Sequence, residues 1–239
     1  MRRITLRALV LLVACVVAMN CGDSGPTSPD DPGGGGGGGI GGGGTGQTHI
    51  ASDGVFDDNG WDTELQVFGP GGTGDAGHLR FNGQVGADYR RITITANTAE
   101  GSGTAAQVAV FSISRTGSYS PLNDGVIYSI GYSEDSILLS GGGNGQYSAP
   151  ALKQNGKLYT LVPGAGAFPT PETGWTPHSL TGLTRNDFRT IESASEHPDF
   201  SSTGSRIELG FMRLHSVPAG NAGETRVGGI DNWRITLYR

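Results

Sequence analysis

The chain has 239 residues, of which 16 are Lys or Arg and 22 are Asp or Glu, so its formal net charge is −6. Three of the basic residues lie within the first seven positions, so the rest of the chain is more acidic still. Nucleic-acid binding requires a basic face, and this charge balance excludes it as an expected function.

The N-terminal segment has the pattern of a secretory signal peptide. Three arginines in the first seven positions precede an apolar run at residues 8–19. A basic start and a short apolar segment are typical of an export signal, whereas a membrane-spanning helix needs about 20 apolar residues. We therefore predict that residues 1–20 are a signal peptide and that the chain is exported to the cell envelope or cell surface. An uncleaved anchor helix is the alternative.

Both cysteines of the chain, Cys15 and Cys21, lie at the end of this leader. Their placement resembles bacterial lipoprotein signal peptides, in which a cysteine after a small residue is acylated and becomes the mature N-terminus. Cys21 is preferred because it follows a full apolar segment and a polar run begins directly after it. Cys15 is the alternative, because the residues before it fit the lipoprotein pattern better. The resemblance implies a membrane partner through an N-terminal lipid.

A tether follows the leader. In the segment 21–46, the residues after Cys21 are almost all Gly, Pro, Ser, Thr and Asp, with seven consecutive glycines at 33–39. This composition predicts a disordered, flexible coil. A phosphate-binding glycine loop would need an adjacent strand, a helix and a Gly-Lys-Ser/Thr ending, which this segment lacks. Residues 22–239 contain no cysteine, which excludes disulfides, thiolate metal sites and cysteine nucleophiles there.

From residue 47 the sequence changes to short segments in which apolar and polar residues alternate. Residues 89–95, 206–211 and 232–239 each place their apolar side chains on one face. Period-two alternation is typical of antiparallel strands with one buried and one wet face. Residues 107–114 are apolar on both faces, which predicts a central strand. Further strands are predicted at 64–68, 78–82, 126–131, 136–140, 157–162 and 178–183.

Clusters of Gly, Pro, Asn and Asp separate these segments, for example at 69–74 and 141–145. Many short strands joined by such turns predict an all-β fold, an antiparallel β-sandwich of the jelly-roll kind. One helical turn is expected at 186–191. Because no second linker or internal repeat interrupts the pattern, a single domain is predicted from 47 to 239.

The segment 175–239 is similar to the C-terminal part of secreted jelly-roll domains from environmental bacteria. The matching stretches are 179–184, 197–201, 207–211 and Gly229-Ile-Asp-Asn-Trp233. In galactose-binding-like and concanavalin A-like sandwiches the final strand often has this Ile-Asp-Asn-aromatic form. The resemblance supports the fold and implies no particular ligand, because one sandwich hosts many functions.

No catalytic residue is predicted. The chain has no Gly-x-Ser-x-Gly elbow and no His-Glu-x-x-His motif. A glycosidase needs two carboxylates about 5–10 Å apart, but the adjacent Glu134 and Asp135 would point to opposite faces of a strand. Glu192 and Glu196 lie in an expected loop. A glycoside hydrolase is therefore only the second alternative function.

Carbohydrate recognition on a β-sandwich uses exposed aromatic rings and fixed polar groups. Trp61, Trp175 and Tyr147 lie in or beside expected loops and are the candidate ligand-binding residues. Burial in the core is the simpler explanation for the two tryptophans, because large aromatic side chains are mostly buried. The favoured function is a surface-anchored module that binds an extracellular polysaccharide. A structural or envelope-assembly lipoprotein without a small ligand is the first alternative.

A structural calcium ion (Ca²⁺) is the one cofactor that the sequence suggests. Asp53, Asp57 and Asp58 crowd the start of the domain, and calcium binds six to eight hard oxygen ligands. In galactose-binding-like domains a structural calcium often joins the first strand to an acid near the last, and by this resemblance Asp231 completes the set. Acids that are simply solvated in a turn are the alternative.

The predicted anchor is testable by metabolic labelling with a fatty-acid analogue. The wild-type chain is expected to carry the label, and Cys21→Ser is expected to lose it because the acylated thiol is gone. Label that survives in Cys21→Ser and disappears in Cys15→Ser would move the site to Cys15. An unlabelled wild-type chain would exclude the lipoprotein interpretation.

Overall fold

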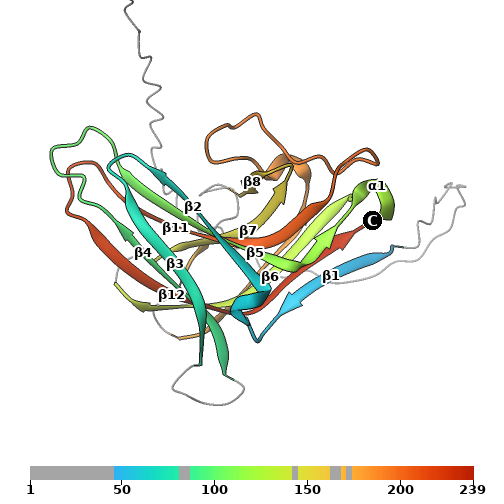
Figure 1. The fold of residues 1–239 in the computed structure, drawn as a ribbon, viewed down its shortest axis with the longest axis horizontal. Helices are drawn as coiled ribbons and strands as arrows, with labels where there is room; N and C mark the ends of the chain where they lie inside the picture. Colours follow the sequence, from blue (N-terminus) through green and yellow to red (C-terminus); the bar gives the residue numbers. More distant parts are fainter. Residues whose placement is uncertain (1–45, 81–86, 142–144, 162–167, 171–173) are drawn as a thin grey trace, which may run out of the picture. The chain divides into compact units, whose positions relative to one another are not determined.

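The computed structural model describes residues 46–80, 87–141, 145–161, 168–170 and 174–239. They lie in one compact unit, Gly43–Arg239, which consists of two antiparallel sheets packed face to face (Figure 1). The predicted all-β sandwich is confirmed. The predicted signal peptide, both cysteines and the predicted tether up to residue 45 fall outside the described residues. Within those ranges, no helix is long and apolar enough to cross a membrane.

The first sheet has the strand order β10-β6-β12-β4-β3. β12 is its centre, because β6 pairs with one side of β12, and β1 and β4 pair with different parts of its other side. The last strand of the chain therefore holds the first strand in place. The strands of this sheet are β1 Thr48–Asp53, β3 Gly72–Arg80, β4 Asp88–Ala96, β6 Ser129–Ser140, β10 Thr176–Leu183 and β12 Glu224–Tyr238.

The second sheet has the order β2-β5-β11-β7-β8, with the short strand β9 paired to the start of β7. Helical structure is confined, among the described residues, to α1 Pro121–Asp124 and the 3-10 turns η1 Asp58–Gly60 and η3 Arg185–Asp187. η3 overlaps the helical turn expected at 186–191. The strands of this sheet are β2 Trp61–Phe68, β5 Ala106–Tyr119, β7 Tyr147–Gln154, β8 Lys157–Thr160, β9 Phe168–Pro169 and β11 Ile207–Val217.

The core lies between the two sheets. An aromatic cluster occupies part of it, with the ring of Trp61 4.9 Å from that of Trp233 and 5.4 Å from that of Phe211. The apolar residues that alternate in the sequence all face this core, as predicted, and are fully buried: Ile92, Ile94, Ile207, Leu209, Phe211, Ile235 and Leu237.

One ion pair joins the two sheets through the core. Arg213 on β11 and Glu134 on β6 are fully buried, and Arg213 Nη2 lies 3.0 Å from Glu134 Oε1. The hydroxyls of Ser148 and Tyr132 also donate to this carboxylate. Burial and the neighbouring Glu134 raise the pKa of Tyr132 well above its usual range, so the phenol stays protonated and can donate. These donors satisfy a charge that would otherwise be very costly to bury.

β7 and β6 differ from the strand predictions. Residues 147–154 were not among the predicted strands, yet they form β7, although Pro150 lacks the N–H that a central strand needs. The Pro150 carbonyl accepts from Thr160 Oγ1. The Pro150 nitrogen, which carries no hydrogen, faces the same side of β7. On that side β7 changes from pairing with β9 to pairing with β8. Residues 129–131 of the strand predicted at 126–131 and the strand predicted at 136–140 form one continuous strand, β6, in which the polar Glu134 between them is buried against Arg213.

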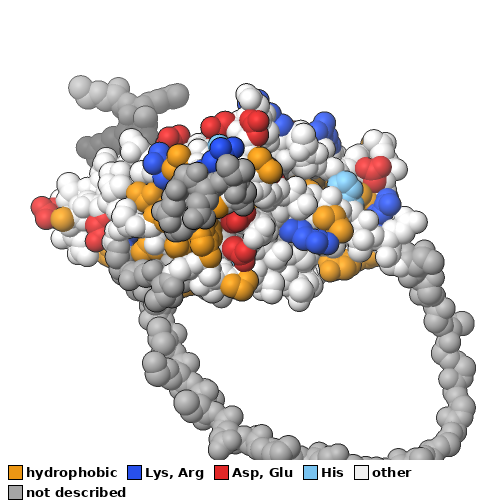
Figure 2. All heavy atoms as spheres, turned by 90° about the horizontal axis from the view of Figure 1, so that it is seen from below, with side chains coloured by type: hydrophobic (Ala, Val, Ile, Leu, Met, Phe, Trp, Pro, Cys, Tyr) orange, Lys and Arg blue, Asp and Glu red, His pale blue; other side chains and the backbone are white. Residues whose placement is uncertain are grey.

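Apolar side chains are not confined to the core. In Figure 2 hydrophobic side chains gather in one area of the face that is shown, with acidic side chains beside them. Single apolar residues are also exposed in the connections between strands, where Leu122 and Tyr128 are 63% and 71% exposed. Isolated exposed residues of this kind are ordinary in soluble proteins, and they provide matched controls for substitutions in the core and at the site.

Phe211→Ala is expected to lower the free energy of unfolding by about 3–5 kcal/mol, because the lost ring leaves a cavity inside the aromatic cluster. Urea denaturation followed by far-ultraviolet circular dichroism measures the change. The control Leu122→Ala, in an exposed position, should stay within about 0.5 kcal/mol of wild type. Equal effects of the two substitutions would contradict the described core.

Candidate functional site

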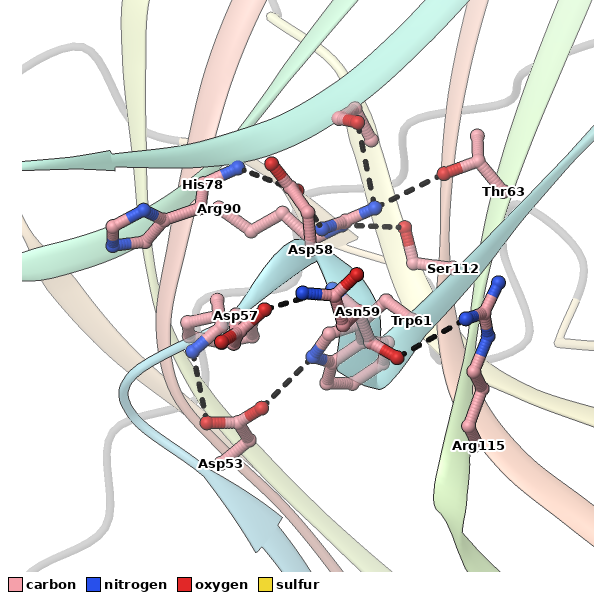
Figure 3. Close-up of polar contacts among 12 residues, drawn as sticks. Asp53, Asp57, Asp58, Asn59, Trp61, Thr63, His78, Arg90, Ser112 and Arg115 are labelled. Atoms are coloured by element: carbon pink, nitrogen blue, oxygen red, sulfur yellow. Dashed lines mark hydrogen bonds and ion pairs between the residues drawn. The ribbon is translucent and has the colours of Figure 1, made fainter.

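The acidic residues at the start of the domain form an ordered turn between β1 and β2 (Figure 3). Asp53 Oδ1 accepts from two backbone N–H groups of the turn at 2.8 and 2.9 Å, and Oδ2 accepts from Trp61 Nε1 at 2.8 Å. Asp57 caps η1 by accepting from the N–H of Asn59 at 2.8 Å. Both acids therefore stabilise the turn through donors of the protein itself.

Asp58 connects this turn to a buried arginine. Its Oδ1 accepts from the backbone N–H of His78 at 2.9 Å and from Arg90 Nη1 at 3.0 Å. Arg90 on β4 is only 2% exposed, and it crosses to the second sheet, where it donates to Thr63 Oγ1 and Ser112 Oγ. Asp58 is thus the charge partner of a cation that bridges the sheets.

The expected calcium ligands do not form one cluster. Asp53, Asp57 and Asp58 each bind different donors, and no group of three or more His, Cys, Asp or Glu side chains within the described ranges is placed to hold a metal ion. Asp231 does approach the turn, since an added Cβ at Gly54 would lie 3.8 Å from its Oδ1. The calcium site stays a prediction.

Asp231 lies on the outer face of the first sheet, beside a second carboxylate. It is the register partner of Asp135 on β6, and a β-bulge in β12 follows it. Asn232, within this bulge, has a left-handed backbone with φ 50°. Its backbone N–H donates to Asp231 Oδ1 at 2.6 Å, and its Nδ2 donates to Asp135 Oδ2 at 2.7 Å. One residue therefore orients both carboxylates.

A groove of about 390 Å³ adjoins this pair. Its size lies in the range of small-ligand pockets, about 300–1,000 Å³. Because β10 is an edge strand, the groove is bordered by the rim of the sheet. Hydroxyl, amide and carboxylate groups contribute to its lining, which includes Ser133 and Asp135 of β6, Pro177 and Ser179 of β10, and Asn232.

An aromatic pair lies on the same face. Trp175, directly before β10, packs over Gly229 of β12, where an added Cβ would lie 2.9 Å from Trp175 Cη2 and 3.1 Å from Tyr89 Cδ2. The two rings meet edge to face, with their centroids 5.6 Å apart. Glycine is needed at this position because a side chain would displace the Trp175 ring, which is half-buried.

The structure separates the three aromatic residues predicted to bind ligand. Trp61 is 3% exposed and packs among other core rings, so it belongs to the core and offers no platform at the surface. Tyr147 begins β7 in the second sheet and packs against the core there. Trp175 lies on the same face as the groove.

Three residues of this face were not singled out from the sequence: Tyr89, Asp135 and Asn232. The signal for Asn232 was present, because Ile230 and Trp233 are both apolar but two residues separate them. Strict alternation cannot bury both, so the spacing indicates a bulge. Asp135 directly follows Glu134, and nothing local in the sequence shows that it lies opposite Asp231.

No protein-family model matches the sequence, and a comparison with curated proteins gives no significant match. Solved structures with a related arrangement include the CBM22-1 xylan-binding domain from Paenibacillus barcinonensis, at 13% identity, 81% coverage of this chain, 96% of that chain and a TM-score of 0.41. An exo-β-agarase matches at 10% identity, with 77% and 24% coverage and a TM-score of 0.39.

A third structure is a carbohydrate-binding module of the β-sandwich superfamily, described as promiscuous in specificity. It matches at 11% identity, with 76% coverage of this chain, 60% of that chain and a TM-score of 0.35. At identities of 10–13% and TM-scores of 0.35–0.41, the resemblance does not establish a shared family or a shared ligand.

The electrostatics of the site predict a pH-dependent effect of Asp231→Asn. Burial raises the pKa of Asp231, and the carboxylates of Asp135, Asp88 and Asp53 raise it further. The folded state therefore binds this proton more readily than the unfolded chain, so ionisation of Asp231 costs stability once the pH rises through its folded pKa. In chelator at pH 7, Asp231→Asn should melt at a higher temperature than wild type.

This advantage should shrink as the pH is lowered toward the ordinary Asp value of 3.8, because the wild-type carboxyl is then protonated as well. Thermal melts across this pH range measure it, with Glu100→Gln as an exposed-acid control. A lower melting temperature for Asp231→Asn at pH 7 would contradict the described environment. Repeating the melts in millimolar calcium tests the calcium prediction, which requires wild type alone to gain stability.

Proposed function

We propose that this domain is a glycan-binding module that holds a polysaccharide segment on the outer face of its first sheet. The observation that carries the proposal is the presence of Trp175 on the same face as a polar groove lined by Asp135 and Asn232. An aromatic ring covers the apolar C–H surface of a sugar, and fixed polar groups bind its hydroxyls. A few placed polar groups beside apolar surface are typical of ligand sites.

The groove offers both kinds of partner that sugar hydroxyls need. Asn232 Nδ2 donates to Asp135 Oδ2, which leaves Asp135 Oδ1 as an acceptor in the groove. The hydroxyls of Ser133 and Ser179 can donate or accept. Because Asn232 already orients both carboxylates, ligand binding has to immobilise few side chains, which favours affinity.

The position of the groove suits a polymer. β10 is an edge strand, and its Pro177 and Ser179 are exposed, so a chain longer than the groove can continue past the rim of the sheet. Export and lipid anchoring at Cys21, which remain predictions, fit this function. A tether at 21–46 would hold the groove away from the membrane and present it to extracellular polysaccharide.

Glycan-array screening of the full chain, followed by calorimetry with the best ligand, tests the proposal. Trp175→Ala is expected to weaken binding at least tenfold, about 1.4 kcal/mol, because the sugar loses its aromatic surface. Asn232→Gly accepts the same left-handed backbone and removes the amide, so it should also weaken binding.

Tyr128→Ala is the matched control, since this aromatic side chain is exposed and does not line the groove. The absence of any glycan ligand, or equal affinity of Trp175→Ala and wild type, would overturn the proposal. A reducing-sugar assay on the same ligand detects hydrolysis, and release of reducing ends would replace binding by catalysis.

A further inference from the structure

Two arginines in the strands of the first sheet have no charge partner. All other lysines and arginines within the described strands form a salt bridge with an Asp or Glu side chain. Arg91 of β4 and Arg234 of β12 are the exceptions among the described residues, and both are exposed. Arg91 precedes the buried Ile92, and Arg234 follows the buried Trp233. Alternation therefore places both arginines on the outer face of the first sheet.

The two arginines bracket the proposed glycan site. Arg91 is the register partner of Gly229, the residue over which the Trp175 ring packs. Arg234 is the register partner of Ser133, which lines the groove. A strand rises about 3.4 Å per residue, so the path along β12 from Gly229 to Arg234 measures about 15 Å once the bulge is allowed for. One cation thus lies at the aromatic end of the site and the other at the groove.

The acids between the two arginines neutralise neither of them. Asn232 donates to Asp135 at 2.7 Å and to Asp231 at 2.6 Å. These bonds orient both carboxylates, and in the described part of the chain neither carboxylate forms a salt bridge with Arg91 or Arg234. The outer face therefore keeps two separate kinds of group, acceptors in the middle and a cation at each end.

The neighbours of Arg91 leave its guanidinium group uncovered. Its register partners are Gly77 on β3 and Gly229 on β12, so neither adjacent strand places a side chain directly beside it. A guanidinium group presents its donors as a planar fork, which matches the two oxygens of a carboxylate. Arg91 can therefore receive a planar anion next to the ring of Trp175.

We propose that the polysaccharide bound at this site is acidic, and that Arg91 and Arg234 each bind the carboxylate of a uronic acid unit. This inference rests on the proposed glycan-binding function and specifies its ligand. Carboxylates recur along a polyuronate, so one chain can present them to both arginines. Its hydroxyls then bind acceptors such as Asp135 between the two arginines, and a sugar ring covers Trp175.

The negative net charge of the chain, −6, does not oppose this ligand at close range. At physiological ionic strength the Debye length is about 8 Å, so acids elsewhere on the surface are largely screened. An arginine in direct contact with a carboxylate is screened much less. Hydrogen bonds between two charged groups are also about twice as strong as neutral ones, so the site favours a uronate over the corresponding neutral sugar.

Calorimetry on the full chain tests this with hexamers of galacturonic, mannuronic and glucuronic acid, each compared with its methyl ester. Esterification removes the charge and keeps the sugar ring and its hydroxyls. At least one of the acids is expected to bind, at least tenfold more tightly than its ester. This difference should shrink in 1 M salt, where the Debye length falls to about 3 Å.

Arg91→Gln and Arg234→Gln are each expected to weaken binding of the acid at least threefold and to leave the affinity for the ester unchanged. Arg206→Gln removes the same charge from an exposed position just before β11, in the other sheet, and should leave both affinities unchanged. Trp175→Ala should weaken binding of acid and ester alike, because the aromatic surface contacts the sugar ring in both.

The proposal is overturned if none of the acids binds, if the esters bind as tightly as the acids, or if Arg91→Gln and Arg234→Gln both behave like Arg206→Gln. Tighter binding of a sulfated galactose hexamer than of any uronate would also overturn it, because the anion would then be a sulfate ester. A neutral glycan that binds while the uronates fail would leave the glycan-binding function standing, whereas failure of all glycans would overturn both.

Discussion

Both surfaces of the first sheet depend on a single β-bulge in β12. Ile230 and Trp233 are buried although two residues separate them, and an unbroken strand would place one of the two outside. The left-handed backbone of Asn232 absorbs the extra residue. As a result, Trp233 reaches the aromatic core while Asp231 and Asn232 remain on the outer face. The packing of the core and the polar side of the candidate groove are therefore fixed by the same local distortion.

Two of the buried arginines hold carboxylates whose role differs from that of Asp135. Arg213 and Arg90 each reach from one sheet to the other, and each is held by a carboxylate, Glu134 or Asp58. A buried cation without its partner is costly, so these acids are committed to stability. Asp135, by contrast, is held by an amide, which orients a carboxylate without neutralising its charge. Its charge remains available at the surface.

Alternation predicted most strands because period two is a local property of the chain. It could not predict the ion pair of Glu134 and Arg213. The two residues lie 79 positions apart, and each is a charged residue of the kind expected on a solvent-exposed face. The residues of the candidate site could not all be predicted from the sequence, for a related reason. Trp61 and Trp175 both follow a glycine at the start of a strand, yet one fills the core and the other lies over Gly229. Only the pairing of distant strands distinguishes them.

A second groove, of about 400 Å³ and lined in part by Glu64 and Lys157 of the second sheet, differs in chemistry from the groove on the first sheet because its charged side chains are longer. Small residues on the outer face of the first sheet, such as Gly229, let an aromatic ring lie close to the strands, and short polar groups then surround the groove. The outer face of the second sheet instead carries long charged side chains, and Lys153 of β7 reaches Glu64 of β2 there. Because each groove is lined by a different sheet, a ligand in one does not occupy the contacts of the other. Substitutions far apart and without shared partners act nearly additively, so the two faces of this sandwich can be altered separately.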